Sequence, residues 1–143
     1  MRPFLSLSTL SLALLLGGCG AAAGPQLSAP EAEQALTRHE LTLIDIRTPP
    51  EWRETGLAAG AVPITMHQDE RAFVAAVSRE VGGDKNAPIG LICRTGNRSR
   101  HMQRVLRDAG FTRVYDISEG MAGSSAGPGW VRRGLPVVPC PNC

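Results

Sequence analysis

Short apolar runs alternate along the chain with stretches of helical periodicity. The runs at 41–46, 88–92 and 112–117 predict buried strands, and a weaker short strand is predicted around 61–64. Between them, apolar side chains recur on one helical face over 70–81 and again over 99–109. Strands that alternate with helices across short connections predict an α/β fold, a parallel sheet of about five strands with helices on both faces.

Polar residues and glycines punctuate these elements. Ser28, a proline in the first turn and Glu31 form a capping-box pattern that predicts a helix from Pro30 to about His39. Asp69 is the expected N-cap of the helix at 70–81, and Gly110 is the expected C-cap of the helix at 99–109.

The most informative segment is 93–100, with the sequence CRTGNRSR, which joins the strand at 88–92 to the helix at 99–109. In a parallel sheet, ligands bind beyond the carboxyl ends of the strands, which is where Cys93 falls. Inward-facing loop N–H groups and the helix N-terminus would stabilise a thiolate there. We therefore expect Cys93 to be a nucleophile. The alternative is that it serves as a small buried apolar side chain.

The first residues have the pattern of an export signal. Residues 1–18 combine one early arginine with an apolar stretch too short to span a bilayer, which predicts a signal peptide. The sequence LGGC at 16–19 resembles the lipobox of bacterial lipoproteins, so we expect a lipid on Cys19, a tether over 19–27 and a membrane-anchored protein facing the periplasm. An ordinary signal peptide cleaved near residues 21–23 is the alternative.

Composition narrows the function classes. The chain beyond the tether is long enough for one domain, predicted over 28–139, with a short tail at 140–143. The net charge is only +2, and no basic run is interleaved with aromatic residues, so nothing in the sequence favours nucleic-acid binding.

Four landmarks in order resemble the rhodanese family. They are DIRTPPEW at 45–52, GLAAGAVPI at 56–64, the loop CRTGNRS at 93–99, and EGMAG at 119–123 followed by Trp130 and GLP at 134–136. The segment at 57–59 and the connection at 124–129 depart from the family pattern. The resemblance therefore does not predict the shape of the pocket wall beside the loop.

This resemblance implies a sulfurtransferase with Cys93 as the catalytic residue and no cofactor or metal. Sulfane sulfur from thiosulfate or a related anionic donor would be held on Cys93 as a persulfide and passed to a thiol or cyanide acceptor. The substrate-binding loop would comprise Arg94, Thr95, Gly96, Asn97, Arg98 and Ser99. Asp45 and Arg47 are expected to form a structural ion pair near the site.

Two other functions fit parts of the pattern. Phosphatases and arsenate reductases with a related loop place arginine six residues after the cysteine, whereas Arg98 stands at position five and Ser99 at position six. A non-catalytic rhodanese-fold binding module in the cell envelope is the remaining alternative. Such inert copies typically lose the cysteine that this chain keeps.

Cys140 and Cys143 form a C-x-x-C pair at the end of the chain. A local disulfide is the simplest expectation for an exported protein, and a redox or resolving pair for the Cys93 persulfide is the alternative. Zinc is a poorer fit because the histidines lack a matching spacing.

Overall fold

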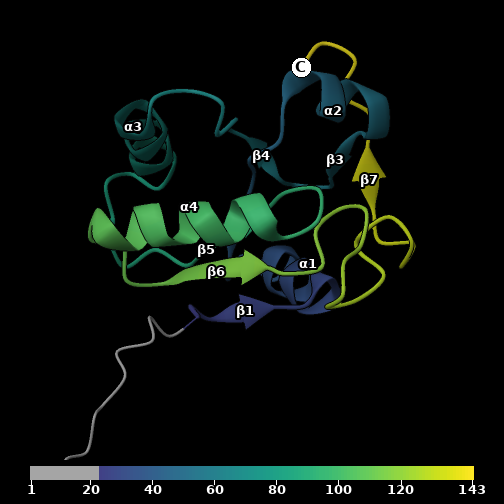
Figure 1. Ribbon diagram of the computed structural model, residues 1–143, viewed down its shortest axis with the longest axis horizontal. Helices are drawn as coiled ribbons and strands as arrows, with labels where there is room; N and C mark the ends of the chain where they lie inside the picture. Colours follow the sequence, from purple (N-terminus) through teal and green to yellow (C-terminus); the bar gives the residue numbers. More distant parts are fainter. Residues whose placement is uncertain (1–22) are drawn as a thin grey trace, which may run out of the picture.

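The computed structural model describes residues 23–143, whose centre is a five-stranded parallel sheet (Figure 1). The strand order is β1-β6-β5-β2-β4, and every neighbouring pair is parallel. The strands are β1 (Gln26–Leu27), β2 (Thr42–Asp45), β4 (Val62–Pro63), β5 (Ile89–Ile92) and β6 (Val114–Ile117). The predicted signal peptide and Cys19 lie outside the described residues.

Helices cover both faces of this sheet, as predicted. On one face, α3 (Glu70–Glu80) and α4 (Asn97–Asp108) bury Phe73, Val77 and Leu106 against β2, β5 and β6. On the other face, α1 (Ala29–Thr37) packs beside a C-terminal segment that contributes Trp130. The α/β class and the helix positions read from the sequence are therefore confirmed.

A short helix, α2 (Pro49–Thr55), follows β2 and was not predicted from apolar periodicity. Thr48 caps its N-terminus by accepting a hydrogen bond from the N–H of Glu51, while the Glu51 carboxylate accepts one from the N–H of Thr48. This capping box places Glu51 at the carboxyl end of the sheet, close to the strand end that carries Cys93.

The last residues of the predicted tether, 26–27, belong to the sheet. Gln26 and Leu27 form β1, which pairs with β6, and the buried Gln103 side chain donates hydrogen bonds to the carbonyls of Pro25 and Val114. The ordered domain therefore begins before residue 28. No helix within residues 23–143 is long and apolar enough to cross a membrane.

At the other end of the chain, β7 (Val137–Val138) pairs antiparallel with β3 (Leu57–Ala58), which directly follows α2. Cys140 and Cys143 form a disulfide whose Cα atoms are 5.4 Å apart. The Arg53 guanidinium donates a hydrogen bond to the carbonyl oxygen of Cys143. The tail is thus attached to the domain beside α2.

Candidate active site

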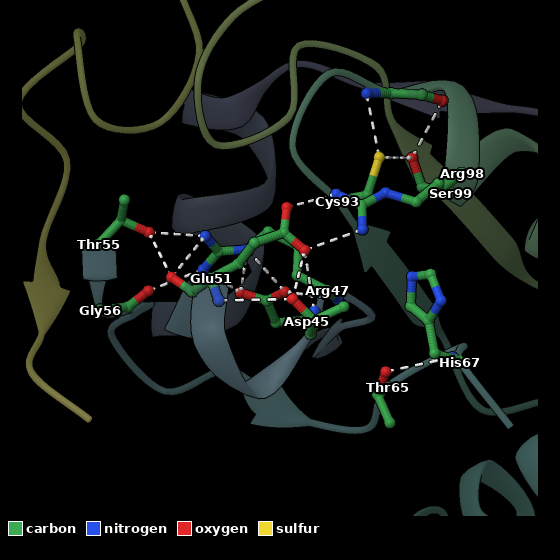
Figure 2. Close-up of polar contacts among 12 residues, drawn as sticks. Asp45, Arg47, Glu51, Thr55, Gly56, Thr65, His67, Cys93, Arg98 and Ser99 are labelled. Atoms are coloured by element: carbon green, nitrogen blue, oxygen red, sulfur yellow. Dashed lines mark hydrogen bonds and ion pairs between the residues drawn. The ribbon is translucent and has the colours of Figure 1, made fainter. Parts of the chain in front are cut away.

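Cys93 lies directly after β5, at the base of the loop that leads into α4, and is only 1% exposed. Its Sγ accepts a hydrogen bond from the Gly96 N–H at 3.1 Å and lies 3.4 Å from Ser99 Oγ. Figure 2 shows the Cys93 sulfur facing Ser99. The loop therefore directs one backbone N–H donor at the sulfur, a contact of the kind that stabilises a thiolate.

Two glycines allow this loop to pack closely against the segment after β6. Gly96 has φ 87°, and a Cβ there would collide with the Ser118 carbonyl. Gly120 has φ 66°, and a Cβ there would collide with the Arg94 carbonyl. The Met121 N–H donates to the Cys93 carbonyl at 2.9 Å. The segment after β6 therefore also holds the start of the loop by a backbone hydrogen bond.

Arg98 is held by Glu51 across the space between α4 and α2. Its Nη1 and Nη2 donate to the two carboxylate oxygens of Glu51 at 2.9 and 2.6 Å (Figure 2). Hydrogen bonding from Arg98 lowers the pKa of Glu51 to about 2 against the opposing effect of burial. The pair with Glu51, together with a smaller contribution from Cys93, raises the pKa of Arg98. Arg98 therefore links α2 to the nucleophile.

Asp45 and Arg47 form the predicted structural ion pair, which is almost wholly buried. Arg47 Nη2 lies 2.7 Å from Asp45 Oδ2, and the guanidinium also donates to Thr55 Oγ1 at 2.6 Å and to the Gly56 carbonyl at 2.7 Å (Figure 2). This fork fixes the end of α2 to the end of β2. It supports the position of Glu51 and takes no part in the loop around Cys93.

A cavity of about 240 Å³ opens beside the loop. Arg94 and Arg132 contribute guanidinium groups to it, Glu54 contributes a carboxylate from α2, and Met121 and Val131 supply apolar wall. Arg94 and Arg132 are exposed, and neither forms an ion pair with another residue of the described segment. These cations are therefore available to an anionic ligand, whereas Arg98 is already engaged.

Ser99 connects Cys93 to a buried carboxylate that the sequence did not reveal. Ser99 Oγ donates to Asp116 Oδ1 at 2.6 Å, and Asp116, on β6, is 0% exposed. Burial raises the pKa of Asp116, although the hydrogen bond from Ser99 and the charge of Arg100 oppose this. An aspartate within an otherwise apolar strand was the available signal, because charged groups are rarely buried without a partner.

Two more of the predicted substrate-binding residues are exposed, whereas Glu119, part of the EGMAG landmark, is buried. Thr95 is exposed on the loop, and Asn97 is exposed at the first position of α4. Glu119 is buried and accepts hydrogen bonds from the N–H groups of Ala29 and Gly129 and from Arg133; together these lower its pKa although burial opposes them. It joins the segment after β6 to α1, which is a structural role.

The C-terminal cysteines are bonded to each other, so the predicted disulfide is observed and neither offers a free thiol in this form. Cys93 is the free cysteine of residues 23–143. Within the same residues no group of three or more His, Cys, Asp or Glu side chains is arranged to hold a metal ion.

Similarity to known proteins agrees with this geometry. A sulfurtransferase of Allochromatium vinosum is 30% identical over 107 residues, which cover 75% of this chain and 87% of that protein. The thiosulfate sulfurtransferase GlpE of Pseudomonas syringae is 31% identical over 91 residues, covering 64% and 78% of the two chains. The solution structure of a polysulfide-sulfur transferase homodimer from Wolinella succinogenes aligns with TM-score 0.62 and 25% identity, covering 82% of this chain and 80% of that one.

The chain also matches a protein family over most of its length. Residues 28–126 match the rhodanese-like domain, and this segment contains the β5–α4 loop, the Asp45–Arg47 pair and most of the sheet. The expected rhodanese fold is thereby confirmed. The chain belongs to the rhodanese-like domain family.

Proposed function

We propose that the protein is a sulfurtransferase that carries sulfane sulfur as a persulfide on Cys93. The observation that carries this proposal is the position of the Cys93 sulfur at the base of its loop, within 3.1 Å of the Gly96 N–H and beside Ser99. A thiolate at this position would be a nucleophile with a backbone N–H already oriented toward it. The names of the sulfurtransferase relatives support the same reaction class.

With thiosulfate as donor, the first step balances without a cofactor. The Cys93 thiolate attacks the outer sulfur, a sulfur–sulfur bond forms, and the bond to the sulfonate group breaks as sulfite leaves with the electron pair. The terminal sulfur of the persulfide is then attacked by an acceptor thiolate, which takes that sulfur and returns Cys93 as a thiolate. The Gly96 N–H already donates to the Cys93 sulfur before any sulfur is loaded.

The donor would bind in the cavity beside the loop. Arg94 and Arg132 line this cavity and can meet the oxygens of an anion by charge-assisted hydrogen bonds. Met121 and Val131 provide an apolar wall suited to sulfur and to the stem of a thiol acceptor. Thiosulfate, a polysulfide or a small persulfide all share the features that these residues recognise.

Phosphatase or arsenate reductase chemistry is less well supported. Such a reaction needs an arginine that is free to hold the equatorial oxygens of a tetrahedral oxyanion. The arginine nearest that role is Arg98, which stands one position earlier than in those loops and whose two terminal nitrogens are bonded to Glu51. An oxyanion would have to displace that carboxylate.

We further propose that this activity operates on a lipid-anchored protein facing the periplasm. The proposal rests on the lipobox-like sequence that ends at Cys19, ahead of the ordered domain. Mass spectrometry of the mature protein tests it, since an acylated N-terminal Cys19 is expected. A mature chain that starts at residue 21 or later without acyl groups would contradict it.

Sulfur loading tests the central proposal. The protein is incubated with thiosulfate, separated from excess donor, and digested for mass spectrometry. We expect one added sulfur atom on the Cys93 peptide and none in Cys93→Ser. Arg94→Gln should load about tenfold more slowly, because a charge-assisted hydrogen bond is worth about 1.5–3 kcal/mol. Arg104→Gln, a matched change at an exposed position of α4, should load normally. A correctly folded protein that gains no sulfur would refute the proposal.

A further inference from the structure

Asp116 is a buried acid beneath the nucleophile, and only one of its oxygens is hydrogen-bonded. Oδ1 accepts the Ser99 hydroxyl at 2.6 Å, while Oδ2 is buried without a hydrogen-bond partner. The nearest cationic atom to Oδ2 is Arg100 Nε, at 3.7 Å, beyond hydrogen-bond distance. A buried carboxylate with one oxygen unbonded is costly, whereas a carboxylic acid in the same place costs much less.

Ser99 contacts both this acid and the sulfur, and it has a single proton to donate. Its Oγ lies 2.6 Å from Asp116 Oδ1, 3.1 Å from the Gly96 carbonyl and 3.4 Å from Cys93 Sγ. When Asp116 is ionised, the shortest contact takes the hydroxyl proton, and the Ser99 lone pairs suit a protonated thiol. When Asp116 is protonated, the acid donates to Ser99 instead, which frees the hydroxyl proton to face a thiolate.

We propose that Cys93 and Asp116 share one proton through Ser99, so that Asp116 is protonated when Cys93 is a thiolate. The proton leaves Cys93 Sγ for Ser99 Oγ while the proton of Ser99 moves to Asp116 Oδ1. No electrons are transferred, and the buried cluster keeps the same net charge. Asp116 is therefore a positioning residue that acts on the sulfur through Ser99.

The surrounding charges are consistent with one negative charge shared by this pair. From α4, Arg98 faces Cys93 and Arg100 faces Asp116, and Glu51 of α2 stands behind Arg98 and is bonded to it. Strand β1, which pairs with β6 alongside Asp116, carries no titratable side chain. If Cys93 and Asp116 were both ionised, the pair would carry two negative charges. Arg98 and Arg100 aside, these neighbouring elements offer no buried cation to stabilise the second charge.

This inference deepens the proposed function, because it concerns how the same nucleophile is kept ready. The proton held on Asp116 stays inside the protein while the thiolate attacks the sulfur donor. It can return to Cys93 by the same path once the acceptor has taken the sulfur. Cys93 is 1% exposed, so a base from solvent has little access to its proton. Transfer of that proton to Asp116 makes such a base unnecessary.

The test is a pH titration of thiolate absorbance near 240 nm, taken as the difference between the protein and Cys93→Ser. This readout needs neither a sulfur donor nor access of a reagent, so it can fail independently of sulfur transfer. In Asp116→Asn, the amide can donate to Ser99 but cannot take up the proton. The unsubstituted pair loses its last proton from a cluster that already carries one negative charge, whereas the cluster in Asp116→Asn carries none. We therefore expect the midpoint to move to lower pH by about one pH unit.

Two further variants separate the relay from a simple charge effect. Asp108→Asn removes the same charge at the exposed far end of α4 and should leave the midpoint unchanged. In a Ser99→Ala background, Asp116→Asn should move the midpoint by less than half as much. The proposal would be overturned if Asp116→Asn moved the midpoint equally with and without Ser99. It would also be overturned if Asp116→Asn moved the midpoint no further than Asp108→Asn does, or moved it to higher pH.

The unsubstituted protein offers an independent measurement if Asp116→Asn fails to fold. The carboxyl ¹³C shift of Asp116 should titrate with a second step at the midpoint of the thiolate absorbance, because a coupled pair titrates as a unit. That step should disappear in Cys93→Ser. A single-step titration that is the same in both proteins would overturn the proposal.

Discussion

The ion pair between Glu51 and Arg98 makes a sharp prediction, because it joins α2 to the first turn of α4, which directly follows the Cys93 loop. We consider Glu51→Gln. Glutamine at this position keeps the capping box with Thr48, since its side-chain oxygen can still accept from the Thr48 N–H. The substitution therefore removes the charge on the bridge to Arg98 and leaves the start of α2 intact.

The magnitude follows from the pKa of Glu51. A fall from 4.5 to about 2 corresponds to roughly 3.4 kcal/mol at neutral pH. The side chains of Arg98 and Glu51 are 28% and 20% exposed, so water screens part of this interaction. We expect Glu51→Gln to lower the free energy of unfolding by about 1.5 kcal/mol.

The stabilisation that Glu51 contributes should decrease as the pH falls. The pKa of Glu51 is depressed in the folded protein, so its contribution is fully present above the unfolded-state value and is lost as the pH falls from about 5 toward 2. The difference in unfolding free energy between the unsubstituted protein and Glu51→Gln should therefore be constant above about pH 5.5 and shrink at lower pH.

Urea unfolding at several pH values measures this difference, with fluorescence of the buried Trp52 and Trp130 as the signal. Glu54→Gln is the matched control, on the same helix and outside every ion pair of residues 23–143. A difference that does not change with pH, or an equal loss in Glu54→Gln, would refute the assigned role of the pair.

Three further predictions concern the frame of the site. Gly96→Ala should destabilise the domain by more than about 1 kcal/mol and slow sulfur loading, because the new Cβ collides with the Ser118 carbonyl at positive φ; normal loading and stability would contradict this. Arg47→Lys should cost about 3 kcal/mol in urea unfolding, since an ammonium cannot reproduce a buried fork, and a loss below about 1 kcal/mol would be inconsistent with that fork. Replacing Cys140 and Cys143 by serine should leave Cys93 loading unchanged and reduce stability by at most about 2 kcal/mol, given the short closed loop. Slower release of the sulfur from loaded Cys93 would instead support the tail as a resolving pair.

Much of this fold could be predicted from local sequence patterns. The strand before Cys93 is continuous and apolar, the helix from Ala29 begins at a capping box, and short connections leave a parallel sheet as the natural arrangement. The position of Cys93 at a strand end could be predicted for the same reason.

Other features were harder to predict because they depend on contacts between distant segments. Helix α2 is too short for a periodic apolar face, although the TPPE sequence at 48–51 carries the same kind of capping signal as the segment before α1. Strand β1 is two residues long and exists only because β6 offers an edge to it.

The site partners show the same limit. Arg98 was expected to face the donor, and only the three-dimensional arrangement brings Glu51, 47 residues away in sequence, within hydrogen-bond distance. Asp116 is likewise joined to Ser99 across 17 residues. Sequence spacing predicts neither partner, because each depends on how strand ends meet at one edge of the sheet.

The most direct measurement of the central claim is a single turnover in two separate steps. The protein is loaded with thiosulfate labelled in its outer sulfur, freed of donor, and then mixed with an acceptor thiol. The account predicts one labelled sulfur on Cys93 after the first step and its stoichiometric appearance on the thiol after the second. Labelled transfer to the thiol by Cys93→Ser, or a loaded protein that never releases its sulfur to a thiol, would contradict it.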